Sequence, residues 1–319
     1  MADAEVPRVV GGRTRPEDRS PTDAELSTAN EPRGELSRHL RIGTISLVLD
    51  GLDERLAGLV DDQYQGFLVD ADASENAGRI EVRRSPASAW LHLPRGEGGE
   101  EARMEARTDA ELLVLWSYFF ALRFDREGRV GRLVVCDVDD ADLGQAVENV
   151  LRFFLSTVAL ARGGFVLHSS GVLRKGRTFL FFGPSGAGKS TTASHPEEGD
   201  CLGDDLVLLE RRAEGWQACG VPFRGSFDTS ERNVNASGPL AMACRLFQAE
   251  ENRLETTIAA IALAELMGQV PFLLDDDELR RRAGANLKQL LDEVPVRRLH
   301  LKKDPSFWSL LDEAVDAAG

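Results

Sequence analysis

The sequence predicts an α/β fold in which a smaller β-rich N-terminal domain precedes the main core. Three observations lead to this prediction. Apolar and polar residues alternate in short segments between about residues 40 and 137, as in half-buried strands. Apolar residues then recur at three- and four-residue steps from 140 to 161, as on one face of a helix. Finally, the apolar run Phe179–Phe182 leads through a glycine-rich turn into a polar segment suited to a helix start.

Composition narrows the class of protein. A chain of 319 residues with 42% hydrophobic and 29% charged residues is long enough for two globular domains. The net charge of −15 argues against a nucleic-acid partner, because a phosphate backbone requires a basic surface. The four cysteines show neither disulfide nor zinc spacing. No signal-peptide pattern opens the chain, and no apolar run reaches the roughly 18 residues that span a membrane, so we expect a cytoplasmic protein without membrane contact.

The N-terminal part divides into a tail and a domain. Residues 1–38 are polar and rich in proline and charge, which predicts a disordered tail. Residues 39–138 are expected to form the β-rich domain. Its predicted strands are 42–49, 67–69, 79–82, 89–93 and 130–135, and the apolar segment 110–124 fits either a helix or a strand.

The core is expected over residues 139–319. A helix over 140–161 stops at the glycines Gly163 and Gly164, and a strand follows that ends at His168. After the glycine-rich turn the helix must be short, because Pro196 interrupts it. The remaining predicted elements are a strand at 206–209, a hairpin at Gly215, helices at 239–249, 256–267 and 277–294, a strand at 296–301, and a last helix at 305–317.

The glycine-rich turn carries a phosphate-binding pattern of the P-loop (Walker A) type. The pattern G-x-x-x-x-G-K-[ST] lies between a strand and a helix start, where backbone N–H groups can turn inward around an anion. A lysine would reach the outer phosphates, and the following hydroxyl would help to hold Mg²⁺. We therefore expect ATP and Mg²⁺ as ligands of Gly183, Pro184, Ser185, Gly186, Ala187, Gly188, Lys189, Ser190 and Thr191.

Two further features accompany this loop. The acidic pair Asp204–Asp205 begins 21 residues after Gly183 (204 − 183), and His168 lies 15 residues before it (183 − 168). One carboxylate near a metal–phosphate site can hold the metal, and the other can accept the proton of an attacking hydroxyl. The sequence leaves open which aspartate takes which role.

His168, the loop and the acidic pair, at these spacings, resemble the HPr kinase/phosphorylase family and, more closely, HPr-kinase-related proteins with the same nucleotide core. Phosphoenolpyruvate carboxykinases are more distant relatives by fold. The resemblance covers about residues 164–225. It implies that Asp204 is the base, that Asp205 joins Ser190 on the metal side, and that His168 lies near the transferred phosphate. Because HPr kinases assemble into oligomers, it also implies a homo-oligomer.

An arginine is expected beside the transferred phosphate, because phosphoryl transfer benefits from a cation on the moving group. Arg224 is the first candidate and Arg232 the second. HPr kinases carry a longer signature after such an Arg-Gly pair, and this chain departs from it at Ser226–Asp228. This departure leaves open whether the chain has a phosphorylase activity and whether HPr is its substrate.

The sequence thus predicts a Mg-ATP-dependent kinase that transfers the γ-phosphate to a hydroxyl, with a serine of a small protein or peptide as the first candidate. Two alternatives stay open. A small-molecule kinase or carboxykinase-like enzyme would need several arginines around an anion, and a non-catalytic ATP-binding regulator would need the loop but no base.

Overall fold

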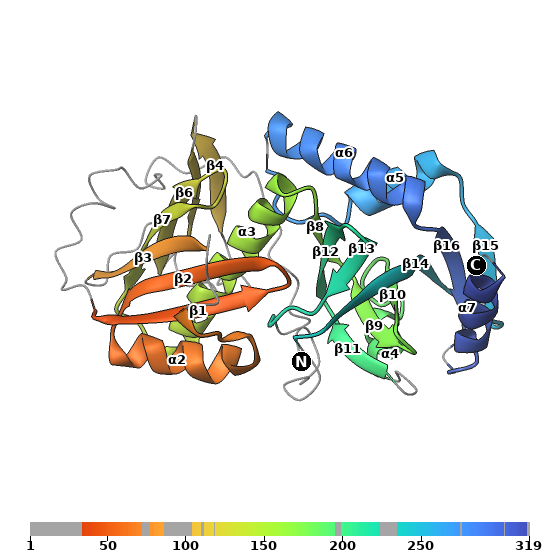
Figure 1. The fold of residues 1–319 in the computed structure, drawn as a ribbon, viewed down its shortest axis with the longest axis horizontal. Helices are drawn as coiled ribbons and strands as arrows, with labels where there is room; N and C mark the ends of the chain where they lie inside the picture. The colour runs from red at the N-terminus through yellow and green to blue at the C-terminus, as the bar shows by residue number, and fades with distance from the viewer. Residues whose placement is uncertain are drawn as a thin grey trace, which may run out of the picture. The chain divides into compact units, whose positions relative to one another are not determined.

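The computed structural model describes residues 34–71, 77–85, 104–109, 112–117, 119–194, 199–223, 235–274, 276–302 and 304–317. The chain forms two compact units (Figure 1). The N-terminal unit comprises the described residues up to Val158 together with Phe272–Leu279. The C-terminal unit comprises those within Ala159–Pro271 and Arg280–Gly319. The fold is α/β with mixed sheets and a β-rich N-terminal region, as the sequence predicts at this level.

One mixed sheet organises the N-terminal unit. Within the described residues it has seven strands, of which β2, β3 and β7 run parallel and the other neighbours antiparallel. Across the sheet the order is β1 (Leu36–Ile42), β2 (Ile45–Leu52), β3 (Gly78–Ser85), β7 (Val130–Cys136), β6 (Phe120–Asp125), β5 (Leu112–Trp116) and β4 (Glu105–Asp109).

Among the described residues, two helices lie mainly in this unit. α2 (Glu54–Tyr64) begins at Asp53, whose carboxylate accepts a hydrogen bond from the Leu56 N–H and so caps the helix. The long helix α3 (Asp140–Ala161) packs Phe153 against Phe124 of β6, with ring centroids 5.5 Å apart. The helix predicted over 140–161 is thus confirmed, and its apolar face packs on the sheet.

Several predicted elements of this unit are wrong in detail. The single strand expected at 42–49 is a hairpin, because Gly43 adopts a left-handed conformation (φ 58°) between β1 and β2. The strand expected at 67–69 is replaced by the end of a 3-10 turn, Gln65–Phe67, after a helix that the sequence analysis did not predict. The ambiguous segment 110–124 contains strands β5 and β6, while the strand expected at 89–93 lies outside the described residues, as do residues 1–33 of the expected tail.

The C-terminal unit is built on a second mixed sheet. Nine strands of the described chain belong to it, with β16 and β15 attached beyond β14 (Figure 1). Their bounds are β11 (Gly199–Gly203), β9 (Ser170–Arg174), β10 (Arg177–Phe182), β14 (Ser237–Gln248), β13 (Gly215–Cys219), β12 (Leu206–Arg212), β8 (Phe165–His168), β16 (Val296–Leu301) and β15 (Arg253–Thr256).

The strand directions define one edge of this sheet. β10, β14 and β16 are parallel neighbours, so their carboxyl ends lie together. β11 and β10 are both antiparallel to β9, so β11 ends at the same edge. In sheets with parallel strands, ligands bind outside the carboxyl ends. We call this the carboxyl edge of the sheet.

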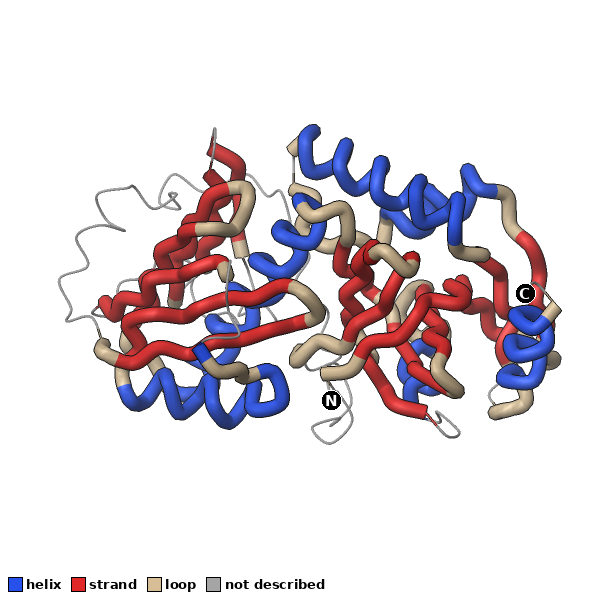
Figure 2. The backbone as a smooth tube through the Cα atoms, in the orientation of Figure 1, coloured by secondary structure: helices blue, strands red, loops and turns tan. Residues whose placement is uncertain are grey.

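Helices cover the two faces of the parallel strands (Figure 2). α7 (Phe307–Asp316) packs Phe307 and Trp308 against Phe179 and Phe181 of β10, in a core that includes side chains from β14 and β16. The other helices are α4 (Lys189–Ser194), α5 (Ala259–Met267) and α6 (Asp277–Glu293). The predicted helices at 256–267, 277–294 and 305–317 and the strand at 296–301 are therefore confirmed, with shifts at their ends.

The helix predicted at 239–249 is wrong, because this segment forms the long strand β14. Leu240, Met242, Cys244 and Leu246 are buried at every second position, which is the period of a strand. Parallel pairing with β10 on one side and β16 on the other holds the segment extended. Tertiary pairing thus overrides the local helical spacing.

Candidate functional site

The glycine-rich loop lies at the carboxyl edge, between β10 and α4. Gly183, Gly186 and Gly188 adopt φ angles of 156°, 77° and 115°, which a side chain would strain. Gly188 also lies close to β16, because a Cβ atom there would be 2.9 Å from Cδ2 of Leu301. Pro184, Ser185 and Gly186 are exposed, whereas Ala187 is buried, and its N–H donates to the Pro184 carbonyl at 3.1 Å. The loop therefore needs glycine for both its conformation and its packing.

Lys189 reaches back over this loop. Its Nζ donates a hydrogen bond to the Gly183 carbonyl at 2.9 Å. Burial lowers the pKa of Lys189; the nearby carboxylate of Asp205 opposes this shift and the nearby guanidinium of Arg245 adds to it. Lys189 is thus a desolvated amine close to one anion and one cation, a setting in which an added anion would be favourable.

The residues after Lys189 anchor the start of α4. Ser190 and Thr191 are half-buried, and Thr192 is fully buried. The Thr192 hydroxyl donates to the Lys189 carbonyl at 2.6 Å and lies 3.1 Å from the Ser170 hydroxyl on β9. These contacts hold the start of α4 against β9. Ser190, the residue directly after Lys189, takes no part in them.

The acidic pair follows β11 at the same edge. Asp204 is buried, with 4% of its surface exposed, whereas the Asp205 side chain is 16% exposed. His168, at the end of β8, places its Nδ1 3.6 Å from Oδ1 of Asp205. That distance is beyond a normal hydrogen bond but within electrostatic reach. The structure therefore brings His168, Asp205 and Lys189 together, and Asp204 is the buried residue that precedes Asp205 in the chain.

The arginines expected beside the transferred phosphate, Arg224 and Arg232, lie outside the described residues. Another arginine, Arg245 of β14, is at the loop instead. A Cβ atom on Gly183 would lie 2.7 Å from Nη1 of Arg245, so this guanidinium touches the first glycine. The sequence analysis missed it, because its segment was expected to be a helix; as a strand, the alternation would place Arg245 opposite the buried Cys244 and Leu246.

Within the described residues, no three His, Cys, Asp or Glu side chains lie close enough together to hold a metal ion. Over the same residues, no helix is long and apolar enough to cross a membrane. The carboxylate of Asp205 and the hydroxyl of Ser190 remain the oxygen groups near the loop that suit Mg²⁺, an ion that usually takes one or two protein oxygens beside phosphates.

Fold and site together define a two-unit α/β protein with a glycine-rich, lysine-bearing loop at the carboxyl edge of a mixed sheet. The chain belongs to the ScmC family: the family model described as "SynChlorMet cassette protein ScmC" matches residues 134–316, more than half of its length. No curated protein shows a significant match to the chain.

The family match corrects the resemblance to HPr kinase/phosphorylase that the sequence analysis stated, because the matching family is ScmC. The earlier interpretation relied on the spacing of His168, the loop and the acidic pair. A strand, a glycine turn and a following carboxylate can recur in different families, since any anion site at a strand end needs similar groups. Roles for these residues must therefore be argued from their own geometry.

Proposed function

We propose that this protein is a Mg-ATP-dependent kinase that transfers the γ-phosphate of ATP to a hydroxyl, with a serine of a small protein or peptide as the first candidate acceptor. The observation that carries the proposal is the meeting of a glycine-rich loop, a desolvated lysine and an acidic pair at one sheet edge. Phosphoryl transfer requires little more than a phosphate cradle, a metal, a cation and a base.

The loop and Lys189 are proposed to hold the phosphates. With glycines at three positions, the backbone from Gly183 to Ser190 can approach an anion closely. Lys189 now donates to the Gly183 carbonyl, and we expect it to exchange this neutral acceptor for a charged phosphate oxygen. Ser190 and Asp205 would hold Mg²⁺ in this arrangement, and the electrostatic contact between Asp205 and Lys189 supports a metal-side role for Asp205.

Asp204 is proposed as the base that takes the proton of the acceptor hydroxyl, and His168 as a group beside the transferred phosphate. The 4% exposure of Asp204 supports a dry, preorganised carboxylate but also requires the acceptor to reach it. The exchange of roles between Asp204 and Asp205 is therefore the alternative that variants must decide. Arg224 keeps its proposed role as a cation on the moving phosphate.

A second candidate function is a kinase that acts on a small anionic molecule. It is favoured by one observation: Arg245 touches the loop, and Arg298 lies beside it in register on β16. A non-catalytic ATP-binding regulator is the third candidate. The acidic pair argues against a regulator, because nucleotide sensing alone requires no base.

The proposal is tested by phosphate transfer from γ-labelled ATP into a cell extract, with the wild-type protein and Asp204→Asn compared. The expected result is a labelled protein or peptide that needs wild-type protein and Mg²⁺ and is lost with the variant. Label in a small molecule under the same conditions would support the second candidate. Tight Mg-ATP binding by both forms without any transfer would contradict the kinase.

A further inference from the structure

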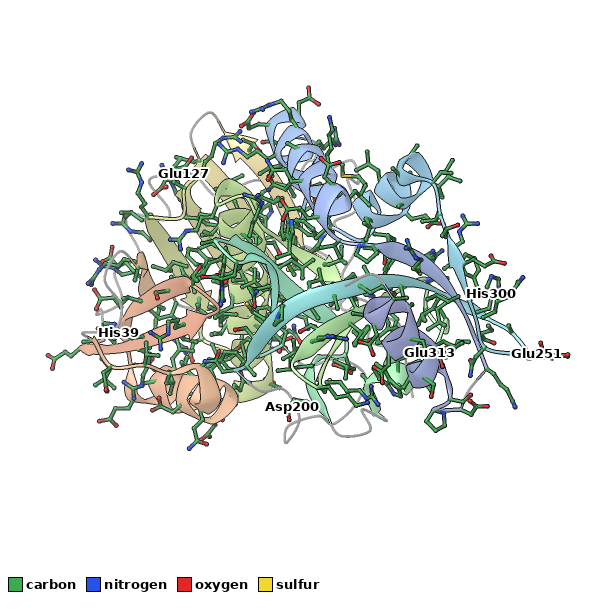
Figure 3. The ribbon with its side chains drawn as sticks, turned by 45° about the vertical axis from the view of Figure 1, so that its right-hand side comes forward. His39, Glu127, Asp200, Glu251, His300 and Glu313 are labelled. Carbon is green, nitrogen blue, oxygen red and sulfur yellow. The ribbon has the colours of Figure 1, made fainter. Side chains whose placement is uncertain are left out.

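A charged face lies next to the loop on the parallel strands. Along β14 and β16, side chains alternate between the two faces of the sheet. Leu246, Leu299 and Leu301 belong to the core around α7. Arg245, Phe247, Arg298 and His300 occupy the alternate positions and so face the other way, toward α5. His300 can be located on β16 in Figure 3.

This face holds two arginines around one aromatic ring. Arg245 and Arg298 are register partners on adjacent strands, and their guanidinium carbons lie 5.4 Å and 5.6 Å from the ring centroid of Phe247. The His300 ring stacks on Phe247 at 5.4 Å. Phe247 is thus enclosed by cations and an imidazole, and it keeps the two guanidinium groups in place.

Two carboxylates accompany these arginines, but neither satisfies all of their donors. Glu255 of β15 pairs with His300, its Oε2 lying 3.1 Å from Nε2, and interacts electrostatically with Arg298. Glu265 of α5 is shared by both arginines, with an oxygen 3.7 Å from Nε of Arg245 and 3.5 Å from Nη2 of Arg298. Within the described part of the chain, the buried Nε and Nη1 of Arg245 and Nε of Arg298 meet no hydrogen-bond acceptor. A buried donor without an acceptor costs about 1–3 kcal/mol, and more when it is charged. An oxyanion would satisfy these donors.

We propose that Arg245 and Arg298 form a subsite for a compact oxyanion, a carboxylate or a phosphate, carried by the acceptor molecule rather than by ATP. The strand order indicates that this oxyanion would be separate from the phosphates of ATP. Arg298 is two strands from β10, roughly 10 Å at the usual strand spacing, whereas the nucleotide phosphates would lie at the end of β10 itself. Arg245 bridges the two positions through its contact with Gly183.

The subsite narrows the substrate class. The planar guanidinium forks of two arginines match the geometry of carboxylate and phosphate oxygens. An acceptor would therefore carry a carboxylate or phosphate in addition to the hydroxyl that is phosphorylated. In this respect the inference rests on the proposed function, whereas the anion site itself can be tested without any transfer.

The test is a calorimetric titration of the full chain, saturated with Mg²⁺ and a non-hydrolysable ATP analogue, with inorganic phosphate as the probe. Wild-type protein should bind one phosphate. Arg298→Gln should weaken this binding about 10- to 100-fold, the range for loss of a charged hydrogen bond, while its affinity for the ATP analogue stays unchanged. Arg297→Gln is the matched control, since it lies one residue earlier on the same strand and faces the opposite side.

A parallel titration with malonate identifies the source of the oxyanion: tighter malonate indicates a carboxylate-bearing acceptor, and tighter phosphate indicates a phosphorylated one. Arg298→Lys, which keeps the charge but loses the fork, should bind less tightly than wild type and serves if Arg298→Gln does not fold. No phosphate binding at about 10 mM in wild type, or equal binding by Arg298→Gln, would overturn the proposal. Competition between phosphate and the ATP analogue would also overturn it, because the site would then belong to the nucleotide.

The two proposals can fail separately in these titrations. If the ATP analogue does not bind, the kinase proposal fails, and phosphate binding that depends on Arg298 would still establish the oxyanion site. If the analogue binds but phosphate does not, only the oxyanion site is lost.

Discussion

At the scale of single residues, Lys189 carries a cost that a ligand would remove. Its amine is partly desolvated and near another cation, so its pKa is below the ordinary value of 10.5. The charged form is therefore disfavoured in the folded protein relative to the unfolded chain. The penalty is present below the lowered pKa and disappears as the pH approaches 10.5, since the unfolded chain then also loses the proton. Stability and function oppose each other at this residue.

Replacement of Lys189 by methionine should therefore raise the thermal unfolding temperature of the ligand-free protein at about pH 7, and this gain should be clearly smaller at about pH 10. Lys288→Met, on the exposed surface of α6, should change neither value. Thermal unfolding followed by circular dichroism at both pH values measures the effect. A lower unfolding temperature for Lys189→Met at neutral pH would show that the amine stabilises the empty loop.

The transfer rates of Asp204→Asn and Asp205→Asn should respond differently to added Mg²⁺. Asp204→Asn should lower the transfer rate about 10²- to 10⁴-fold, the range for a general base, without a change in Mg-ATP affinity. Asp205→Asn should instead weaken Mg²⁺ binding, so that excess Mg²⁺ restores part of the rate. Transfer rates measured against Mg²⁺ concentration distinguish them. If excess Mg²⁺ restores the transfer rate of Asp204→Asn and not that of Asp205→Asn, Asp204 would be the metal-side group and Asp205 the base.

At the scale of elements, the loop between β10 and α4 depends on glycine for its shape. At Gly188 a side chain would require an unfavourable φ of 115° and would meet Leu301 of β16. Elsewhere a glycine is dispensable: Gly58 lies on the exposed side of α2, and a Cβ atom there meets nothing within 4 Å. The same substitution should thus have opposite effects in the two elements.

Gly188→Ala should destabilise the protein by about 1–3 kcal/mol, because the backbone is strained and the packing against β16 is disturbed. Gly58→Ala should stabilise it by about 0.5–1 kcal/mol through the helix propensity of alanine. Chemical denaturation gives both values. A Gly188→Ala protein as stable as wild type would mean that the loop relaxes freely and that its glycine has no structural role.

The start of α6 is held by a buried carboxylate. Asp276 accepts hydrogen bonds from the backbone N–H groups of Glu278 and Leu279, from the Thr108 hydroxyl, and from Arg126 at 2.9 Å. Burial alone would raise its pKa, but these donors prevail and lower the pKa from 3.8 to about 2. Asp276 therefore contributes stability that is complete above pH 3.8 and is lost as the pH falls toward 2.

Asp276→Asn should accordingly lower the free energy of unfolding by about 1–3 kcal/mol at neutral pH, since a helix cap and a buried ion pair are both weakened. The difference from wild type should shrink between about pH 4 and pH 2, where the wild-type carboxylate is also protonated. Denaturation curves over this range measure it. A difference that stays constant down to pH 2 would exclude the charge of Asp276 as its cause.

The elements also show where sequence-based prediction fails. Helix α3 and strand β10 could be predicted, because a long amphipathic pattern and a short apolar run are local signals. Strand β14 could not, because its pairing with β10 and β16 comes from residues far away in the chain. This error hid Arg245, whose position at the loop follows only from the strand register.

At the scale of the whole molecule, two units with separate sheets carry a net charge of −15, yet cations collect at the carboxyl edge of the second sheet. Lys189, Arg245 and Arg298 lie there on neighbouring elements. The loop residues could be identified from the sequence motif, but the family could not: residue spacing implied HPr kinase, and the family match is to ScmC. Spacing reports local chemistry, whereas family membership depends on the pattern over 134–316.

The central claim is that the glycine-rich loop binds Mg-ATP through Lys189, and isothermal titration of Mg-ATP into wild type, Lys189→Ala and Lys288→Ala tests it most directly. The account predicts binding by wild type and the Lys288 control, and a loss of about 10- to 100-fold in affinity for Lys189→Ala, as expected for a charge-assisted contact with phosphate. Equal affinities of wild type and Lys189→Ala, or no binding by wild type, would contradict it.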